Sequence, residues 1–395
     1  MKNDFLLIGI DGGATKVSGC QVIVNEKDNS FLLGQEHAKR SYSEIPGYVQ
    51  NFKPIELAIQ LAEKEAAEIN PTDDEQQQAA VYIEACARVV EELVEKSNQR
   101  KLLIGLGMPG LKTNDKRGIA MIANGPRMIN FTDQLEKRLA IRDIKFIQPI
   151  QKLGSDADYC GIGENYSKDG LFHDVENAYY LGGGTGAADA MKLDGKLMPF
   201  DEIKEWVAKS WEMQNEAGRS LEQFASAGGM QSIYAEFAGK SIAYLSEANI
   251  YPLQIAEMAG NGDSVAKKTF TLIAENLALL LFERITTLFA GWQDLFSFIN
   301  PNRTPLQKYH PRRGYLFQRI VIGQRLGELF DSKTGLIILK KPVFNKLELL
   351  IQQSTILDNL AKNHYQNLDG IIQVSSLRAA PALGAGIDAF MSMKN

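Results

Sequence analysis

Residues 8–16 read IGIDGGATK, and residues 17–24 continue as VSGCQVIV. A glycine-rich turn after an apolar strand often binds phosphate, but the dinucleotide and P-loop fingerprints require a helix after the turn. Here the residues after the turn are rich in β-branched side chains, which predicts a second strand. The stretch therefore predicts a phosphate-binding turn inside a β-hairpin. A tight hairpin without a ligand is the alternative when this turn is taken alone.

The same pattern returns in the second half of the chain. Residues 178–198 read AYYLGGGTGAADAMKLDGKLM: an apolar strand, a glycine-rich turn, a second strand and a tight Asp-Gly turn. Two copies predict a duplicated fold with a cleft between its halves, and they favour phosphate binding over a plain hairpin. A chain of 395 residues is also long enough for two domains. We expect an α/β fold whose domains cover residues 1–150 and 151–395.

The composition narrows the class of protein. The chain is 45% hydrophobic and 23% charged, with a net charge of −5, which argues against a nucleic-acid partner. No signal peptide is expected, and Glu283 and Arg284 interrupt the most apolar stretch, so no membrane partner is expected either. The three cysteines are far apart and lack metal-site spacing, which suits a reducing compartment. We expect a cytoplasmic protein.

The two turns have the residues that a nucleoside triphosphate needs. Glycines let backbone N–H groups approach phosphate oxygens, because no Cβ atom stands in the way. Asp11 would repel a triphosphate unless a cation lies between them, and Mg²⁺, which keeps most of its waters, fits that position. Thr15 and Lys16 add a hydroxyl and a positive charge. The predicted phosphate-binding residues are Gly12, Gly13, Thr15 and Lys16 in the first turn and Gly183, Gly184, Thr185 and Gly186 in the second.

A general base is predicted where the two halves meet. Phosphoryl transfer to a hydroxyl needs a group that accepts the proton of the attacking hydroxyl. Asp156 precedes the helical run YCGIGE, so its carboxylate is expected at a helix start, facing a cleft. The alternative is that Asp156 or Asp158 only caps this helix, which is a common role for aspartate. Together with two phosphate-binding turns, we favour the general base.

Six stretches of the chain resemble the ROK family, the repressor, open-reading-frame and kinase branch of the actin-like ATPase and sugar kinase superfamily. In chain order they read IGIDGGATK, IGLGMPGL, SDADYCGIGE, GGGTGAADAMKLDGKL, RIVIG and ALGAGIDAF, from about residue 6 to residue 390. The resemblance implies two ribonuclease-H-like, actin-type domains with an ATP and sugar cleft between them. It also implies a last helix that returns to the N-terminal domain, a homodimer, and transfer of phosphate from MgATP to a sugar hydroxyl with Asp156 as the base.

The resemblance assigns further site residues. Ser155 stands where the family has a sugar-binding asparagine, and Asn124 resembles part of the loop that closes over the sugar. Within LEQFASAGG, which resembles another conserved stretch of the family, Glu222 is expected to reach the substrate. Gly323, at the end of RIVIG, and Gly384 resemble the adenosine-binding edge.

The chain also departs from the family. Ser155 is shorter than asparagine, and MPFDEIKEWVAKSWEM lacks the ExGH segment whose glutamate and histidine contact the sugar. No cysteine follows Cys160, so the family's zinc motif is missing and no structural zinc is expected. No helix-turn-helix precedes the first turn, so the DNA-binding branch is not expected. ATP and Mg²⁺ binding thus rest on retained residues and sugar recognition on altered ones. A silent sugar or nucleotide sensor, and an actin-like ATPase that activates a partner, stay open.

Overall fold

The computed structural model describes residues 4–25, 27 and 30–394. The chain forms two compact units. Unit 1 contains the described residues up to Gly170 together with those from Ala379 onward, and unit 2 is Leu171–Arg378. The sequence-based boundary lies after residue 150, whereas unit 1 also contains residues 151–170. As a result, Asp156 belongs to the same unit as Asp11. The C-terminal helix lies in unit 1 as well, the unit to which the family resemblance assigned it.

Unit 1 is built on a sheet with the strand order β3-β2-β1-β4-β7, in which β8 also pairs with β4. Its strands are β1 (Leu6–Gly12), β2 (Lys16–Asn25), β3 (Ser30–Ser41), β4 (Lys101–Gly107), β7 (Lys145–Phe146) and β8 (Leu153–Gly154). β2 runs antiparallel to β1 and β3, whereas β4 is parallel to β1, β7 and β8. The hairpin predicted for residues 8–24 is therefore confirmed.

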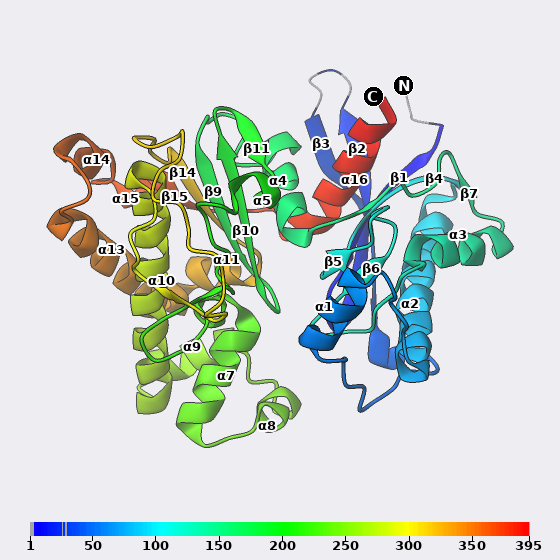
Figure 1. Ribbon diagram of the computed structural model, residues 1–395, viewed down its shortest axis with the longest axis horizontal. Helices are drawn as coiled ribbons and strands as arrows, with labels where there is room; N and C mark the ends of the chain where they lie inside the picture. Colours follow the sequence, from blue (N-terminus) through cyan, green and yellow to red (C-terminus); the bar gives the residue numbers. More distant parts are fainter. Residues whose placement is uncertain (1–3, 26, 28–29, 395) are drawn as a thin grey trace. The chain divides into compact units, whose positions relative to one another are not determined.

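Helices cover the two faces of this sheet (Figure 1). The other elements of unit 1 are the 3₁₀ turn η1 (Tyr42–Glu44), α1 (Leu57–Glu65), α2 (Asp73–Ser97), the short strands β5 (Leu111–Lys112) and β6 (Ile119–Met121), α3 (Phe131–Ile141), α4 (Asp156–Tyr166) and α16 (Ala380–Lys394). A capping box starts α2: Thr72 accepts from the Glu75 N–H, and the Glu75 carboxylate accepts from the Thr72 N–H.

Alternation along β1 decides which helix covers which face, because successive side chains point to opposite sides of a strand. Ile8 and Ile10 belong to the same buried core as the inner face of α2. Gly9 faces the other way, and a Cβ atom there would lie 1.7 Å from the Ala382 carbonyl oxygen of α16. Gly105 of β4 is equally close to the Ala385 carbonyl. The glycines thus let α16 pack directly on the strands.

Unit 2 repeats this topology with the strand order β11-β10-β9-β14-β15. Its strands are β9 (Ala178–Gly183), β10 (Ala187–Leu193), β11 (Lys196–Met198), β14 (Arg319–Gly323) and β15 (Ile372–Val374). Again the first three strands form an antiparallel meander, and the first strand is parallel to the fourth. The duplicated α/β fold expected from the two hairpins is therefore present.

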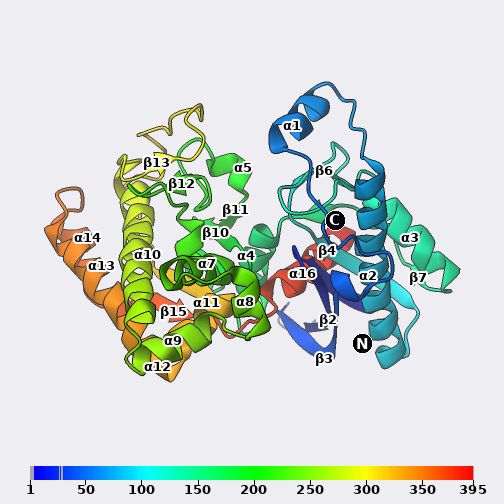
Figure 2. The ribbon, with the colours of Figure 1, turned by 90° about the horizontal axis from the view of Figure 1, so that it is seen from below.

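The rest of unit 2 is mainly helical. Its other elements are α5 (Phe200–Ile203), β12 (Met213–Gln214), α6 (Glu222–Ala225), α7 (Ala227–Ala238), α8 (Ile242–Glu247), α9 (Pro252–Gly260), α10 (Ser264–Ala290), β13 (Ser297–Phe298), α11 (Gln324–Asp331), α12 (Lys333–Gly335), the π-helical η2 (Leu336–Lys340), α13 (Lys341–Gln353), α14 (Asn359–His364) and α15 (Leu368–Ile371). Asp263 caps α10 by accepting from the Ala266 N–H. α10 lies beside α13 in both views (Figures 1 and 2). Among the described helices, none has the length and apolarity that a membrane crossing requires.

Candidate functional site

Asp11 and Asp156 come from adjoining parts of the unit 1 sheet, because Asp11 is in register with Gly107 of β4, and Gly107 pairs with Gly154, two residues before Asp156. Asp11 is the penultimate residue of β1, and Asp156 is the first residue of α4. Burial and, to a smaller extent, the charge of Asp156 raise the pKa of Asp11, Lys16 opposes both effects, and the net result is a pKa of about 7. The raised pKa means that the ionised form of Asp11 is unfavourable next to Asp156. A cation at this place would stabilise the two ionised carboxylates.

The start of α4 bears on both interpretations of Asp156. Ser155, not Asp156, is the N-cap residue, and its side chain makes no capping hydrogen bond. Asp156 is in the first turn, where one carboxylate oxygen accepts from the Ala157 N–H at 3.0 Å. The side chain is partly exposed. The Asp156 carboxylate thus bonds one first-turn N–H, as a capping side chain does, and it is also open enough to accept a proton from a substrate.

Two tyrosines fix the backbone of the first glycine turn by hydrogen bonds. Its carbonyl oxygens at Gly13 and Ala14 accept hydrogen bonds from the hydroxyls of Tyr42 and Tyr82, at 3.1 and 3.0 Å. The Thr15 carbonyl accepts from the Tyr42 N–H at 3.0 Å. Thr15 is exposed. Sequence reasoning missed both tyrosines, because Tyr42 and Tyr82 lie 29 and 68 residues from their partners.

The second glycine turn, in unit 2, is closed by a hydrogen bond of 2.8 Å from the Gly184 N–H to the Gly186 carbonyl. Glu222 lies beside this turn: its carboxylate accepts from the Ala187 N–H at 2.9 Å. A Cβ atom on Gly186 would come within 2.6 Å of the same carboxylate oxygen. The structure thus places Glu222, predicted as a substrate ligand, directly against the second turn.

Gln324 is a residue of this region that sequence reasoning missed. It follows Gly323 at the end of β14 and has a φ of 55°, in the left-handed region that side chains other than glycine rarely adopt. A Cβ atom on Gly184 would lie 3.0 Å from the Gln324 side-chain oxygen. Backbone strain of this kind concentrates at functional sites. Gln324 and Gly323 therefore lie next to the second turn.

The loop that contains Asn124 is anchored in unit 1. Asn124 itself is exposed, whereas the neighbouring Arg127 is buried and binds both oxygens of the Glu75 carboxylate. A Cβ atom on Gly125 would lie 3.4 Å from the hydroxyl of Tyr82. Tyr82 therefore contacts both the first turn and the Asn124 loop.

Gly384 has a packing reason for being glycine. It is buried in α16, and a Cβ atom there would lie 1.9 Å from the Tyr159 carbonyl of α4. The absence of a side chain lets the two helices touch. This packing contact accounts for the glycine without a nucleotide.

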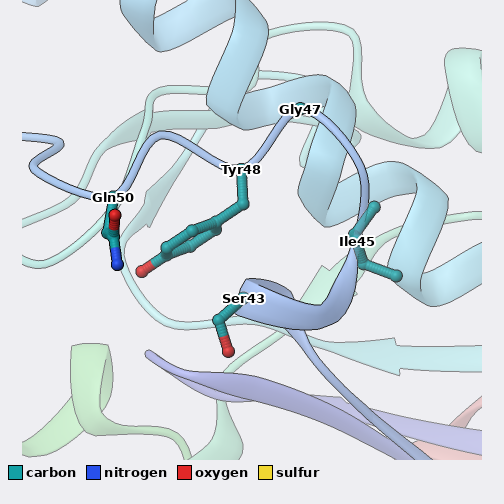
Figure 3. A pocket seen from close by; sticks show the side chains of 5 residues that line it. All are labelled: Ser43, Ile45, Gly47, Tyr48 and Gln50. Carbon is teal, nitrogen blue, oxygen red and sulfur yellow. The ribbon is translucent and has the colours of Figure 1, made fainter.

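A pocket opens on the segment that follows η1 (Figure 3). Its volume is about 550 Å³, and its lining residues are Ser43, Ile45, Gly47, Tyr48 and Gln50. The Tyr48 ring extends toward the space between Ser43 and Gln50 (Figure 3). The segment is tied to α2, since the Gln78 side chain accepts from the Val49 N–H at 2.9 Å. The pocket thus adjoins the tyrosines that hold the first turn.

A magnesium ion fits the carboxylates of unit 1. Within the described part of the chain, no group of three or more histidine, cysteine, aspartate or glutamate side chains could hold a metal. Asp11 and Asp156 form a pair, and Mg²⁺ is commonly bound by one or two carboxylates, with waters and substrate phosphates as the other ligands. The donor set therefore suits magnesium delivered with a nucleotide better than a metal enclosed by the protein.

Comparison with known proteins finds similarity in structure alone. Neither a scan against protein-family models nor a search of curated protein sequences finds a match. A ROK family glucokinase from Streptomyces griseus, in complex with glucose and AMPPNP, superposes with a TM-score of 0.59 at 15% identity, over 98% of this chain and 99% of that one. The ROK hexokinase from Thermus thermophilus gives 0.53 at 14% identity, over 99% of each chain. The chain has the fold of the ROK-family sugar kinases.

The ROK fold is not confined to kinases. A ROK family transcriptional regulator, a homologue of the E. coli MLC protein, superposes with a TM-score of 0.53 at 13% identity, over 99% of this chain and 81% of that one. The fold expected from the six sequence stretches is thus confirmed. Because one fold hosts several functions, the activity has to be argued from the site.

Proposed function

We propose that this protein is a sugar kinase, which transfers the γ-phosphoryl group of MgATP to a hydroxyl of a hexose or related sugar. The pairing of Asp11 with Asp156 in unit 1 is the observation that carries the proposal. A kinase needs a metal-binding carboxylate and a general base at one place. The two glycine turns, one in each unit, supply the backbone for phosphate binding.

Asp156 acts as the general base in this proposal. Its carboxylate takes the proton of the sugar hydroxyl as that oxygen attacks the γ-phosphorus and the bond to the β-phosphate oxygen breaks. Asp11 would hold Mg²⁺ through a water molecule. Mg²⁺ supplies neutralisation of the phosphate charge. Asp11 has a different task from Asp156, although both are carboxylates.

The remaining residues bind and orient. The adenosine edge is assigned to Gly323, and Gln324 joins it because its amide lies beside Gly184. Ser155 and Asn124 of unit 1 and Glu222 of unit 2 are assigned to the sugar. The phosphate groups are assigned to Gly12, Gly13, Thr15, Lys16, Gly183, Gly184, Thr185 and Gly186. A homodimer in the cytoplasm, without nucleic acid or structural zinc, remains part of the proposal.

A non-catalytic sensor is the second candidate. The regulator with the same fold favours it, and so does the missing ExGH segment, because a sugar site with fewer hydrogen-bond partners loses selectivity. An ATPase that activates a partner is the third. The three candidates differ in what they do with ATP. A kinase consumes ATP only when a sugar is present, an activator hydrolyses ATP without a sugar, and a sensor does not consume ATP.

The test is ADP release from MgATP across a panel of hexoses, hexosamines and ketoses. Asp156→Asn should lower the sugar-dependent rate at least about a hundredfold, because it removes the general base. Asp158→Asn is the matched control, since it changes a carboxylate in the same helical turn and should retain turnover. Turnover that survives in Asp156→Asn would rule out the assigned base. A sugar that raises the melting temperature without any turnover would support the sensor.

A further inference from the structure

Tyr42 and Tyr82 form a stacked pair behind the first glycine turn. Tyr42 begins η1 and Tyr82 lies on α2, and their ring centroids are 3.6 Å apart with 14° between the ring planes. Both side chains are almost fully buried, with exposed fractions of 1% and 3%. Stacked and buried rings have little freedom to move, so the two hydroxyls have well-defined positions.

Each hydroxyl bonds a different carbonyl of the turn. The hydroxyl of Tyr42 donates to Gly13, and the hydroxyl of Tyr82 donates to the next residue, Ala14. The backbone N–H of Tyr42 donates to the carbonyl of the residue after that, Thr15. Three consecutive carbonyls are therefore bonded to one pair of tyrosines.

Peptide geometry converts these bonds into a direction for the N–H groups. In a trans peptide unit, the C=O of one residue and the N–H of the next lie in one plane and point in opposite directions. The structure contains no cis peptide bond in its described part. Because the carbonyls of Gly13 and Ala14 point toward the tyrosines, the N–H groups of Ala14 and Thr15 point away from them. Successive N–H groups that point to one side form an anion-binding concavity.

The hydroxyls keep their protons and remain donors at neutral pH. Burial raises the pKa of Tyr42 well above its usual value, with further contributions from Cys86, Tyr82 and Asp11. Burial and the neighbouring Tyr48 raise the pKa of Tyr82. Since a carbonyl oxygen can only accept, a protonated phenol is the partner it needs.

We propose that Tyr42 and Tyr82 are positioning residues for nucleotide binding: their hydroxyls orient the first turn so that the N–H groups of Ala14 and Thr15 face the phosphates of ATP. The inference rests on the proposed function, since it takes this turn as a phosphate site. It adds a reason why a hairpin can replace the helix N-terminus of other phosphate loops. The helix supplies its N–H direction through its own geometry, whereas this hairpin obtains it from two side chains.

Removing the hydroxyls while keeping the rings tests the idea. Calorimetric titrations with the magnesium complex of AMPPNP would compare wild type with Tyr42→Phe, Tyr82→Phe and the double variant. Each single variant should weaken binding about tenfold, because a carbonyl loses its partner and the peptide unit is free to turn. The affinity of Tyr42→Phe for a sugar substrate should not change, because Tyr42 bonds the first turn alone, and in its turnover assays KM for ATP should rise more than kcat falls.

Tyr365→Phe is the matched control. Tyr365 is buried in unit 2, and its phenolic oxygen accepts from the Phe317 N–H at 2.9 Å. The control should lower the melting temperature about as much as Tyr82→Phe does, but nucleotide affinity should be retained. If Tyr82 only stabilised the fold, Tyr82→Phe and Tyr365→Phe would therefore bind the nucleotide with equal affinity.

The outcomes separate this inference from the proposed function. Wild-type affinity in the double variant would overturn the positioning role and leave the kinase proposal standing. Nucleotide binding that depends on both hydroxyls, without phosphoryl transfer to any sugar, would overturn the kinase and support the positioning role. A wild-type protein that does not bind the AMPPNP complex would overturn both.

Discussion

Tyr82, in the middle of α2, donates a hydrogen bond of 3.0 Å to the carbonyl oxygen of Ala14. A helix that contributes its inner face to the core of unit 1 thereby also determines the shape of the first glycine turn. The same hydroxyl lies next to Gly125, in the loop of Asn124. Elements that would contact phosphate and sugar are thus supported by one buried side chain, and changes in the packing of α2 are expected to affect both.

Asp11→Asn should weaken nucleotide binding only when magnesium is present. The amide keeps the size of the side chain but removes the charge that would hold Mg²⁺ through water. Calorimetric titration with ATP, with and without Mg²⁺, should show a loss of about tenfold in the first case and little change in the second. Asp158→Asn should behave as wild type in both titrations. An Asp11→Asn protein with undiminished MgATP affinity and turnover would refute the magnesium role.

Gln324→Gly should stabilise unit 2 and impair nucleotide binding. Relief of the left-handed backbone conformation is worth about 1–2 kcal/mol, which exceeds the roughly 0.5–1 kcal/mol that glycine costs through chain entropy. The side-chain oxygen beside Gly184 is lost at the same time. Urea denaturation and MgATP titration measure the two effects. Gln324→Ala keeps the left-handed backbone conformation and loses the amide, so it should weaken binding without the gain in stability. A Gln324→Gly protein less stable than Gln324→Ala would contradict the claim that the backbone is strained at this residue.

Arg284→Met should destabilise unit 2 strongly. Arg284 is buried, binds Glu283 at 2.8 Å and Asp189 at 3.3 Å, and its removal leaves both carboxylates without their cation. Breaking a buried ion pair on one side typically costs about 3–5 kcal/mol. Lys308→Met is the control, because it removes an exposed ion pair with Asp294, which solvent screens, and it should change the stability little. If chemical denaturation showed that the two variants lose equal stability, burial would not explain the effect of removing Arg284.

Glu84→Gln should make the stability of unit 1 less dependent on pH. Burial alone would raise the pKa of Glu84, but hydrogen bonds from Arg88 and Arg138 and the charge of Arg142 outweigh it and lower the pKa to about 2. A lowered pKa in the folded state stabilises above the unfolded value of about 4.5, and this stabilisation is lost as the pH falls toward 2. The free energy of unfolding of wild type should exceed that of the variant by about 1–2 kcal/mol at pH 7. A difference that stayed constant from pH 7 to pH 3 would contradict this assignment.

Local sequence was sufficient for the elements whose partners are close in the chain. The β1–β2 and β9–β10 hairpins form between residues a few positions apart, and both were expected. The Thr72–Glu75 capping box and the Asp263 cap are equally local. Strand length was less predictable. β3 extends as far as Ser41, because pairing with β2 continues along its whole length.

The folded chain alone decided which distant groups meet. Asp11 and Asp156 interact because α4 belongs to unit 1, although the sequence pattern had assigned it to the second half. Tyr82 reaches Ala14, and Gln324 reaches Gly184, across separations that no short-range pattern encodes. Hydrogen bonding and side-chain period act between near neighbours and can be read in the sequence. Close packing of buried side chains acts between neighbours in space, and it sets these contacts only when the whole core has formed.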